Sequence, residues 1–330
     1  MFGFKKKSHN TGTTSDGLIF SFDDAVAEID KRELLDMFHA TWLQKYYQPP
    51  ISLDGLAKSL RSNSYHESAI MVKRNIILST FNPHPRFSLA EFEKLVTDFL
   101  VLGNAYLKPS KNRIGGVVKY HSPKARWVRV GKNNDFYYLR AGEAEKLRGV
   151  TYHLKSHDLS QDIYGVPEYL SGLNSAWLNE AATLFRRKYY INGSHAGYIL
   201  HITDDLDKDS KENLEKQLKA SKGLGNFKNL LLYSPSGKKD GVNLIPIAEV
   251  TAKDEFYNIK TLTRDDILAA HRVPPQLMSV IPLNTAGFGD VEKASKVFVI
   301  NELLPLQTRL KALNDMVGEE IIRFGEYALT

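Results

Sequence analysis

The segment HRVPPQLMSVIPLNTAGFGDVEKASKVF (271–298) joins two helical patterns and decides how the rest of the chain is divided. The first pattern ends at the double proline Pro274-Pro275, because proline lacks the backbone N–H that a continuing helix needs. A loop with two glycines follows, and a second amphipathic run begins at Asp290. The segment therefore predicts two long helices separated by a loop without a catalytic group.

Upstream of this segment, the pattern predicts a helix over residues 251–272, about 30 Å long. Thr251 and Asp254 resemble a capping box at its start. Further upstream, apolar residues recur at helical spacing in residues 165–193. That run ends in Arg186-Arg187-Lys188, whose positive charges complement a helix dipole or contact DNA, and the sequence leaves both uses open.

The insert between these two helices, residues 195–248, has its own turn residues. It predicts three short strands (AGYILHI, NLLLY and VNLIPI) and one exposed helix (KDSKENLEKQLKAS). After the opening segment, residues 290–325 read as helical, with Pro305 as a kink or break. Two helices that flank an insert allow the insert to project from the body of the protein.

The N-terminal half has a different pattern. The first 20 residues are rich in Ser, Thr, Gly and Lys and predict a disordered tail. A helix is expected after Ser88, a plausible N-cap residue. From Ala105 to Leu139, short β-prone runs broken by Gly, Pro and Asn predict hairpins. The half as a whole reads as an α+β domain.

Composition excludes several classes of protein. The 330 residues include no cysteine, so disulfide scaffolds and thiolate sites are ruled out. The net charge of +6 is compatible with transient contact to a polyanion without demanding it. No apolar core of a signal peptide follows the basic residues near the N-terminus, and the most apolar windows are too short to cross a bilayer.

No arrangement of residues supports catalysis. The stretch SGKK (236–239) lacks the earlier glycine and the Ser or Thr of a phosphate-binding loop, and GLGNFK (223–228) lacks a third glycine. His153 and His157 are four residues apart, but in a strand or loop this spacing does not bring both to one metal ion. The adjacent Asp265 and Asp266 point about 100° apart on a helix. We therefore expect no enzymatic activity, no cofactor and no metal site.

Three segments read together resemble portal proteins of tailed bacteriophages, most closely the short PBSX-type branch of temperate phages with contractile tails. SHDLSQDIYGVPEYLSGLNSAWLNEAATLFRRKYYINGSHAGYIL (156–200) resembles the family's mid-chain block. DDILAAHRVPPQLMSV (265–280) and GFGDVEKASKVFVINELLPLQTRLKALN (287–314) resemble its next two landmarks. VLGNAYL (101–107) is similar to an earlier motif. The order and spacing of these motifs are more specific than any one of them.

The resemblance implies an α+β portal fold with an α/β wing, a two-helix stem, a small α/β clip and a kinked channel-lining helix. On this chain the parts would be a disordered basic tail (1–20), the wing (21–170), a first stem helix (171–194), the clip (195–250), a second stem helix (251–275), a tunnel loop (276–289), and the channel helix with a reduced crown (290–330).

The function implied is that of a structural head–tail connector: a ring, typically of twelve subunits, at one vertex of the capsid. DNA would be packaged and ejected through its channel. The implied partners are other copies of the chain, the terminase large subunit, a head-completion or adaptor protein, the major capsid and scaffolding proteins, and double-stranded DNA bound without sequence specificity, with no membrane. The protein would be assembled in the host bacterial cytoplasm and reside in the virion. The alternative is a monomeric basic nucleic-acid-binding protein.

The expected site residues fall into three groups. They are the tunnel-loop residues Asn284, Thr285, Gly287, Phe288 and Gly289; the channel-lining or inter-subunit charges Arg264, Lys293 and Lys296; and the clip docking residues Lys222, Lys228, Lys238 and Lys239. A loop with little charge suits sliding DNA, because bidentate base contacts of about 1–3 kcal/mol each would stop movement. The sequence leaves two alternatives open: a plain connection with Phe288 buried, and solvated helix faces for the charges.

Overall fold

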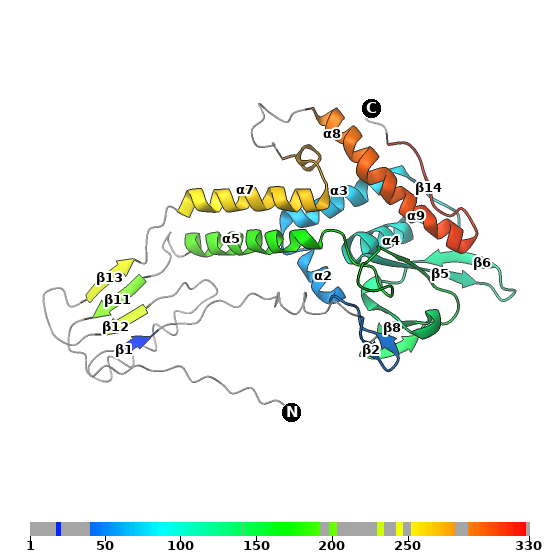
Figure 1. Cartoon of the computed structure of the whole chain (residues 1–330), viewed down its shortest axis with the longest axis horizontal. Helices are drawn as coiled ribbons and strands as arrows, with labels where there is room; N and C mark the ends of the chain where they lie inside the picture. Colours follow the sequence, from blue (N-terminus) through cyan, green and yellow to red (C-terminus); the bar gives the residue numbers. More distant parts are fainter. Residues whose placement is uncertain are drawn as a thin grey trace. The chain divides into compact units, whose positions relative to one another are not determined.

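The computed structural model describes residues 18–20, 40–140, 142–191, 198–202, 230–233, 242–246, 252–280 and 290–327 (Figure 1). The chain divides into two compact units. Unit 1 consists of Met1–Glu28 and Ala181–Ile259, and unit 2 consists of Ile29–Glu180 and Lys260–Thr330.

Unit 2 is a mixed α/β body, as expected for the α+β class. Its helices are α2 (Leu53–Ser59), α3 (Ser64–Thr80), α4 (Leu89–Leu102), the first part of α5 (Leu173–Ile191), the last part of α7 (Ala252–His271), α8 (Val291–Phe298) and α9 (Leu304–Val317). Its strands are β2 (Trp42–Leu43), β3 (Tyr46–Tyr47), β4 (Phe81–Asn82), β5 (Asn104–Lys111), β6 (Val117–His121), β7 (Val128–Val130), β8 (Phe136–Arg140), β9 (Glu143–Lys146), β10 (Tyr152–Lys155) and β14 (Arg323–Phe324).

The helix and hairpins predicted in the N-terminal half are confirmed. The Ser88 hydroxyl accepts a hydrogen bond from the Glu91 N–H and caps α4. The helix ends at Gly103, which adopts the left-handed conformation (φ 67°) that glycine tolerates best. The hairpins are antiparallel, and two three-stranded sheets result, with strand orders β10-β5-β6 and β7-β8-β9.

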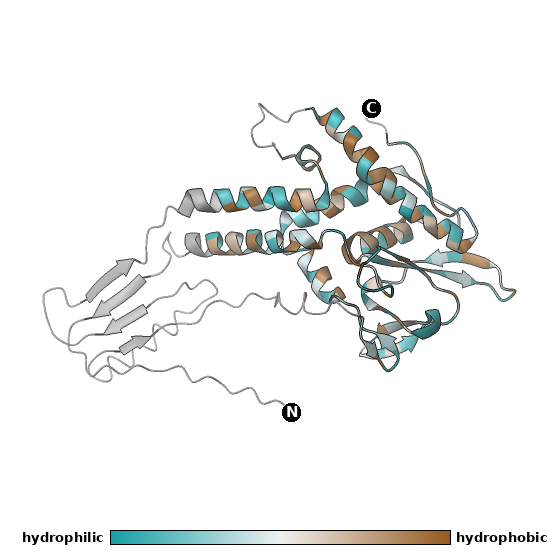
Figure 2. Ribbon diagram, viewed as in Figure 1, coloured by the Kyte–Doolittle hydropathy of each residue, from teal (hydrophilic) through white to brown (hydrophobic). Residues whose placement is uncertain are grey.

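Two clusters of buried side chains hold unit 2 together. The larger one unites α3, α4, the β5–β6 hairpin and the α8–α9 segment. Its members with no exposed surface are Ala69, Ile77, Phe87, Phe92, Leu95, Val96, Ala105, Leu107, Leu313, Ile321 and Ile322. The smaller one joins α2, the β7-β8-β9 sheet and the start of α5 around Trp177 and Tyr106. Along α8 and α9, hydrophobic and hydrophilic bands alternate, as expected for helices with one buried face (Figure 2).

Two of the motifs that carry the family resemblance touch each other in this body. The Asn104 side-chain amide donates to the Gly165 carbonyl oxygen (2.7 Å), and the Gly165 N–H donates to the Asn104 side-chain oxygen (2.7 Å). A Cβ atom on Gly165 would lie 2.5 Å from the Ser156 nitrogen and closer still to the Gly103 carbonyl oxygen. Only glycine fits at position 165, which explains the Tyr-Gly-Val-Pro turn.

The C-terminal region differs in part from the prediction of helix over 290–325. The helical path continues through Pro305 by means of a π-turn at Val299–Leu303, immediately before α9. Proline has no N–H for the preceding turn, and the wider π-turn accommodates this loss without breaking the helix. The helix then ends at Gly318 (φ 76°), and β14 pairs with β4, so the residues after α9 form a strand within unit 2.

Unit 1 contains a four-stranded sheet of order β1-β12-β11-β13, with β1 (Leu18–Phe20), β11 (Tyr198–Ile202), β12 (Leu230–Tyr233) and β13 (Val242–Pro246). The three strands predicted in the insert are thus confirmed. β1 occupies the last three residues of the stretch predicted as a tail and pairs antiparallel with β12. The helix predicted in the insert and the Thr251 cap lie outside the described residues.

Candidate functional site

The junction that follows α7 has an unusual backbone. The last residue of α7 is His271, and Arg272 adopts a left-handed conformation (φ 55°) although it is not glycine. Its N–H donates to the Ala269 carbonyl (3.0 Å), and the Val273 N–H donates to the Leu268 carbonyl (3.1 Å). The two prolines then begin a short 3₁₀ turn, Pro275–Met278, so the helix stops where the sequence predicted.

Polar side chains hold α5 against the part of α7 that precedes this junction. The Asn179 side-chain amide donates to the Thr263 hydroxyl (2.7 Å) and to the Lys260 carbonyl (3.2 Å). Asn63, the N-cap residue of α3, donates to the Asn179 side-chain oxygen (2.9 Å). The Ser175 hydroxyl donates to the Asp266 carboxylate (3.0 Å). The two helices run antiparallel (Figure 1), and α3 is tied to the pair through one buried asparagine.

A pair of buried histidines lies at the end of α7. His66 Nδ1 and His271 Nε2 are 2.8 Å apart, and the Tyr169 ring stacks on His271 with ring centres 5.1 Å apart. Burial lowers the pKa of His66 to about 4. Burial, together with the nearby charges of His66, Lys73 and Arg272, lowers the pKa of His271 to about 2. Both rings are therefore neutral near pH 7, and one donates a hydrogen bond to the other.

An ion network next to the histidines connects α3, α7 and the π-turn. Lys73 Nζ lies 2.9 Å from the carboxylate of Glu302, which belongs to the π-turn, and both side chains are buried. The guanidinium of Arg272 pairs with Glu302 and also with Glu168, and Arg309 of α9 pairs with Glu168. Each of the two carboxylates therefore bridges two cations.

The charged groups in this network shift the pKa values of their neighbours. Burial lowers the pKa of Lys73, although the Glu302 carboxylate opposes the shift. Burial alone would raise the pKa of Glu168, but hydrogen bonds from Arg309 and Arg272 outweigh it and lower that pKa. Removing one partner of a buried ion pair leaves an uncompensated charge, which is much more costly than the loss of an exposed pair. The buried Lys73–Glu302 pair therefore resists separation of α3 from the π-turn.

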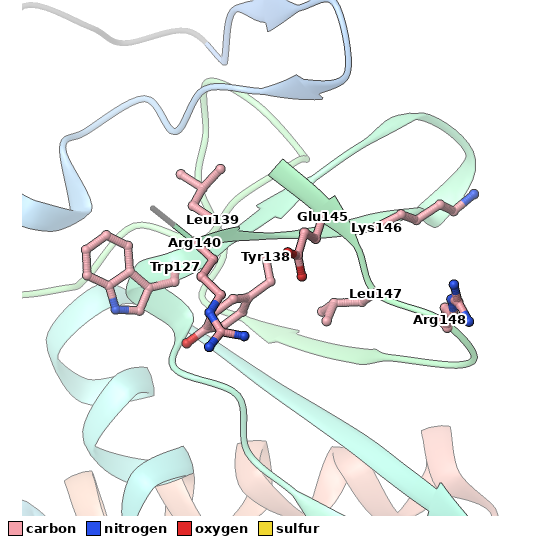
Figure 3. Close-up of a pocket in the computed structure, with 8 residues that line it drawn as sticks. All are labelled: Trp127, Tyr138, Leu139, Arg140, Glu145, Lys146, Leu147 and Arg148. Atoms are coloured by element: carbon pink, nitrogen blue, oxygen red, sulfur yellow. The ribbon is translucent and has the colours of Figure 1, made fainter. Parts of the chain in front are cut away.

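Neither of two concave regions in unit 2 resembles a catalytic pocket. A cavity of about 40 Å³ among Lys73, Glu168, His271 and Arg309 is too small for a nucleotide. A shallow open groove of about 790 Å³ lies on the β8–β9 hairpin, lined by Trp127, Tyr138–Arg140 and Glu145–Arg148 (Figure 3). Within the described ranges, no group of three His, Asp or Glu residues could hold a metal, and no helix is long and apolar enough to cross a bilayer.

The three residues predicted to line the channel or to contact another subunit have different surroundings. Arg264 is mostly covered, and its Nε lies 2.8 Å from the Asp265 carboxylate. Lys293, at the start of α8, is 83% exposed and pairs with Asp290, the N-cap residue. Lys296 is exposed one turn later. The structure therefore leaves two of the three charges exposed on α8.

The other predicted site residues lie outside the described residues. These are the tunnel-loop residues Asn284, Thr285, Gly287, Phe288 and Gly289 and the clip residues Lys222, Lys228, Lys238 and Lys239. The sequence reasoning, in turn, missed the junction residues His66, Lys73, Glu168, Arg272 and Glu302. The one signal available in the sequence was a lysine or glutamate at a position that an amphipathic helix would bury. Such residues are almost never buried without a partner, so this position would have indicated an ion pair.

Comparison with known proteins shows one family. A sequence model described as phage portal protein matches residues 69–320. The chain is 48% identical to the "Probable portal protein" of Escherichia phage P2, over 94% of this chain and 91% of that protein. It is 33% identical to the "Probable portal protein" of Haemophilus phage HP1 (strain HP1c1), over 86% and 85% of the two chains.

Solved structures with the same fold are more distant in sequence. A chain in the neck of a native gene transfer agent particle, computed with C12 symmetry, has a TM-score of 0.60 and 16% identity, covering 90% of this chain and 89% of its own. An HK97 family phage portal protein from Corynebacterium diphtheriae has a TM-score of 0.53 and 13% identity, covering 82% and 94% of the two chains. These likenesses support the α+β fold class.

Proposed function

The chain belongs to the phage portal protein family, and from this premise we propose that twelve copies form a ring at one vertex of a phage head, through which duplex DNA enters and leaves. The chain is a structural portal subunit. The observation that carries the proposal is the 48% identity to a probable portal protein across 94% of this chain. The family model, which matches residues 69–320, also spans the junction between α7 and α8. A separate motor, the terminase, would supply the energy, and the portal itself would catalyse no reaction.

Ring closure requires two different surface patches on each subunit, because a cyclic contact is heterologous. The helical segment from α8 to α9 offers one such patch: Val297, Ile300 and Leu304 are 55%, 64% and 49% exposed at spacings of three and four residues. Leu178 on α5 and Leu262 on α7 are also exposed, and the Asn179–Thr263 hydrogen bond places them at the same level. We assign both patches to contacts between subunits.

This assignment predicts that Ile300→Lys prevents ring closure while the isolated subunit stays folded. Leu159→Lys is a matched control, because Leu159 is a single exposed leucine in a loop (94% exposed). Light scattering after size-exclusion chromatography would report both. Normal rings from Ile300→Lys would exclude this patch as a subunit contact.

The DNA-facing surface would consist of the tunnel loop, residues 276–289, and the first turns of α8. Lys293 and Lys296 are exposed there and supply long, mobile positive charges without base recognition. The ion network behind them would hold the end of α7 and the π-turn in a fixed geometry while the loop contacts moving DNA. Arg264, which is mostly covered, would contribute to the subunit itself rather than to the channel.

The clip, residues 195–250, would dock the terminase large subunit and later a head-completion or adaptor protein, with Lys222, Lys228, Lys238 and Lys239 as its contacts. The wing would meet the major capsid and scaffolding proteins. The subunit would be made in the host bacterial cytoplasm and would remain in the virion. The PBSX-type branch is also part of this proposal.

One experiment separates this function from its alternatives. The purified chain should form annular particles visible by electron microscopy, with a mass near twelve times 37.3 kDa. A monomeric nucleic-acid-binding protein would stay near 37.3 kDa when incubated with scaffolding and capsid proteins. Nucleotide hydrolysis by the pure chain would instead indicate a packaging enzyme. Either result would overturn the proposal.

A further inference from the structure

Positive charge is concentrated in about one fifth of unit 2. Residues 108–155 contain twelve Lys and Arg residues but only three Asp and Glu residues, a net charge of +9, whereas the whole chain carries +6. The rest of the chain is therefore slightly acidic. The asymmetry lies in the strands from β5 to β10, away from α8 and the tunnel loop in the sequence.

Few of these cations are neutralised within the part of the chain that the structure describes. Arg126 pairs with Asp54, and Lys146 pairs with Asp135. Lys108 and Lys155 donate to main-chain carbonyl oxygens, which leaves their net charge in place. The remaining cations of this stretch form no ion pair with any described carboxylate. These cations therefore do not belong to an ion network inside the protein such as the one around Glu302.

The strand register places two of these lysines, Lys108 and Lys119, on one face of the β5–β6 hairpin. In the β5–β6 hairpin, Lys108 is opposite His121 and Ser110 is opposite Lys119, so these side chains share a face. Leu107 and Tyr120 point to the other face, which belongs to the larger core cluster. One face of the hairpin is therefore held by the core, and the other presents cations. The register shifts between Ser110 and Lys111, and beyond this shift the exposed residues Lys111 and Arg113 lie towards the tip of the hairpin.

The charged hairpin continues into the groove on β8–β9. Lys108 Nζ donates to the Arg148 carbonyl oxygen, which brings the two segments into contact. Arg148 and Arg140 line the groove, as Figure 3 shows. We define the basic strip as Lys108, Lys111, Arg113, Lys119, Arg140 and Arg148. Five of the six are exposed, and Lys108 is half-buried.

We infer that the basic strip binds the phosphate backbone of duplex DNA outside the channel, as a second DNA contact of each subunit. Residues 108–155 contain seven lysines, and lysine is depleted in protein–protein interfaces but serves as a point charge for phosphates. The lack of nearby carboxylates fits a polyanion that repeats along its length. DNA packed inside the head would supply this ligand. That source of DNA rests on the proposed function, whereas the contact itself does not require ring closure, because the strip belongs to a single subunit.

A covalently closed circular duplex distinguishes this contact from the channel, because a closed circle cannot thread a closed ring. Binding of the full-length protein to such a circle should weaken as salt rises. The variant Arg113→Gln/Lys119→Gln should bind at least about tenfold more weakly at 0.1 M salt, and its log–log salt slope should be shallower by about 2. The matched control is Lys58→Gln/Arg61→Gln, which removes the same charge from the end of α2 and should bind as the wild type does.

Each outcome is decisive once circular dichroism and light scattering show that both variants fold and assemble as the wild type does. Equal binding of the circle by the two variants would overturn the inference and leave the ring proposal intact. Weaker binding of poly-L-glutamate without any change in DNA binding would assign the strip to an acidic protein instead, and would overturn the inference as well. A strip-specific loss of DNA binding would support it, whether or not rings form.

Discussion

The Lys73 ammonium group and the Glu302 carboxylate form an ion pair 2.9 Å long, and their side chains are only 7% and 8% exposed. The pair joins α3 to the π-turn between α8 and α9, across 229 residues of sequence. Arg272, at the end of α7, pairs with the same carboxylate. One buried glutamate therefore ties three separate segments together at the proposed base of the tunnel loop.

Glu302→Gln should lower the free energy of unfolding by about 3–5 kcal/mol, because Lys73 would keep a buried charge without a counter-charge. Lys73→Met/Glu302→Leu should recover most of this loss, since both buried charges are then removed. Urea unfolding followed by circular dichroism measures both effects. As a control, Lys94→Met, which breaks the surface pair with Glu91, should cost less than about 1 kcal/mol. If Lys94→Met and Glu302→Gln lowered the free energy of unfolding by similar amounts, burial would not be what makes the Lys73–Glu302 pair important.

The His66–His271 pair makes stability dependent on pH. In the unfolded chain both histidines take up a proton near pH 6.5, whereas in the folded chain burial lowers their pKa values to about 4 and about 2. Between pH 6.5 and 4 the unfolded state therefore binds more protons, and the free energy of unfolding falls as the pH falls. Asp98 opposes this, because burial raises its pKa to about 6 and the folded state takes up that proton first.

The contribution of the pair can be isolated with His66→Gln/His271→Gln. On going from pH 6.5 to pH 5, the wild type should lose about 3 kcal/mol more than this variant, because each histidine contributes up to about 1.4 kcal/mol per pH unit in this window. Urea unfolding at the two pH values measures the difference. The single variant His66→Gln should show about half of it. Parallel pH profiles for variant and wild type would mean that the pair does not titrate as the geometry requires.

Gly165→Ala should lower the free energy of unfolding by about 3 kcal/mol, because the added methyl group would collide with the backbone at Gly103 and Ser156. Gly142→Ala is the control: Gly142 has a positive φ (87°) but no atom near its Cβ direction. That change should cost only about 1 kcal/mol, the strain of a left-handed residue. Equal losses of stability would show that contact with Gly103 is unimportant.

Phe288→Ala should leave ring assembly intact and impair DNA filling or retention, since the proposed tunnel loop would lose its largest contact with DNA. Electron microscopy checks the rings, and nuclease protection of packaged DNA checks the filling. Phe288→Tyr keeps the aromatic ring and should package like the wild type. Normal packaging by Phe288→Ala would instead favour a plain helix connection at this position.

Charge reversal in the clip tests partner docking. Lys238→Glu/Lys239→Glu should reduce capture of the terminase large subunit in a pull-down without changing ring mass, because the two charges are proposed to face the partner. Lys58→Glu/Arg61→Glu carries the same change of charge at the end of α2 and should capture terminase normally. Loss of capture by both variants would point to net charge rather than to a clip contact.

The sequence by itself was sufficient for the local elements, because the signals that make them are local. Ser88 and Gly103 mark the two ends of α4 through capping and a left-handed turn, and Pro274 ends α7 by removing a backbone donor. The order of the quoted motifs was sufficient to identify the resemblance to the portal family. The π-turn and the end of α9 at Gly318 were not predicted, because a helix that passes through a proline depends on packing around the altered turn.

The tertiary structure alone decided which charges are structural and which are exposed. Lys73 and Glu302 look like ordinary solvated residues in the sequence, yet they meet in the interior because α3 and the π-turn converge there. Arg272, which is partly exposed, pairs with the same carboxylate from the end of α7. Lys119 and Arg148 look the same, yet they are exposed on the basic strip. A charge becomes buried or exposed through contacts between segments far apart in the chain, and no local pattern in the sequence encodes those distances.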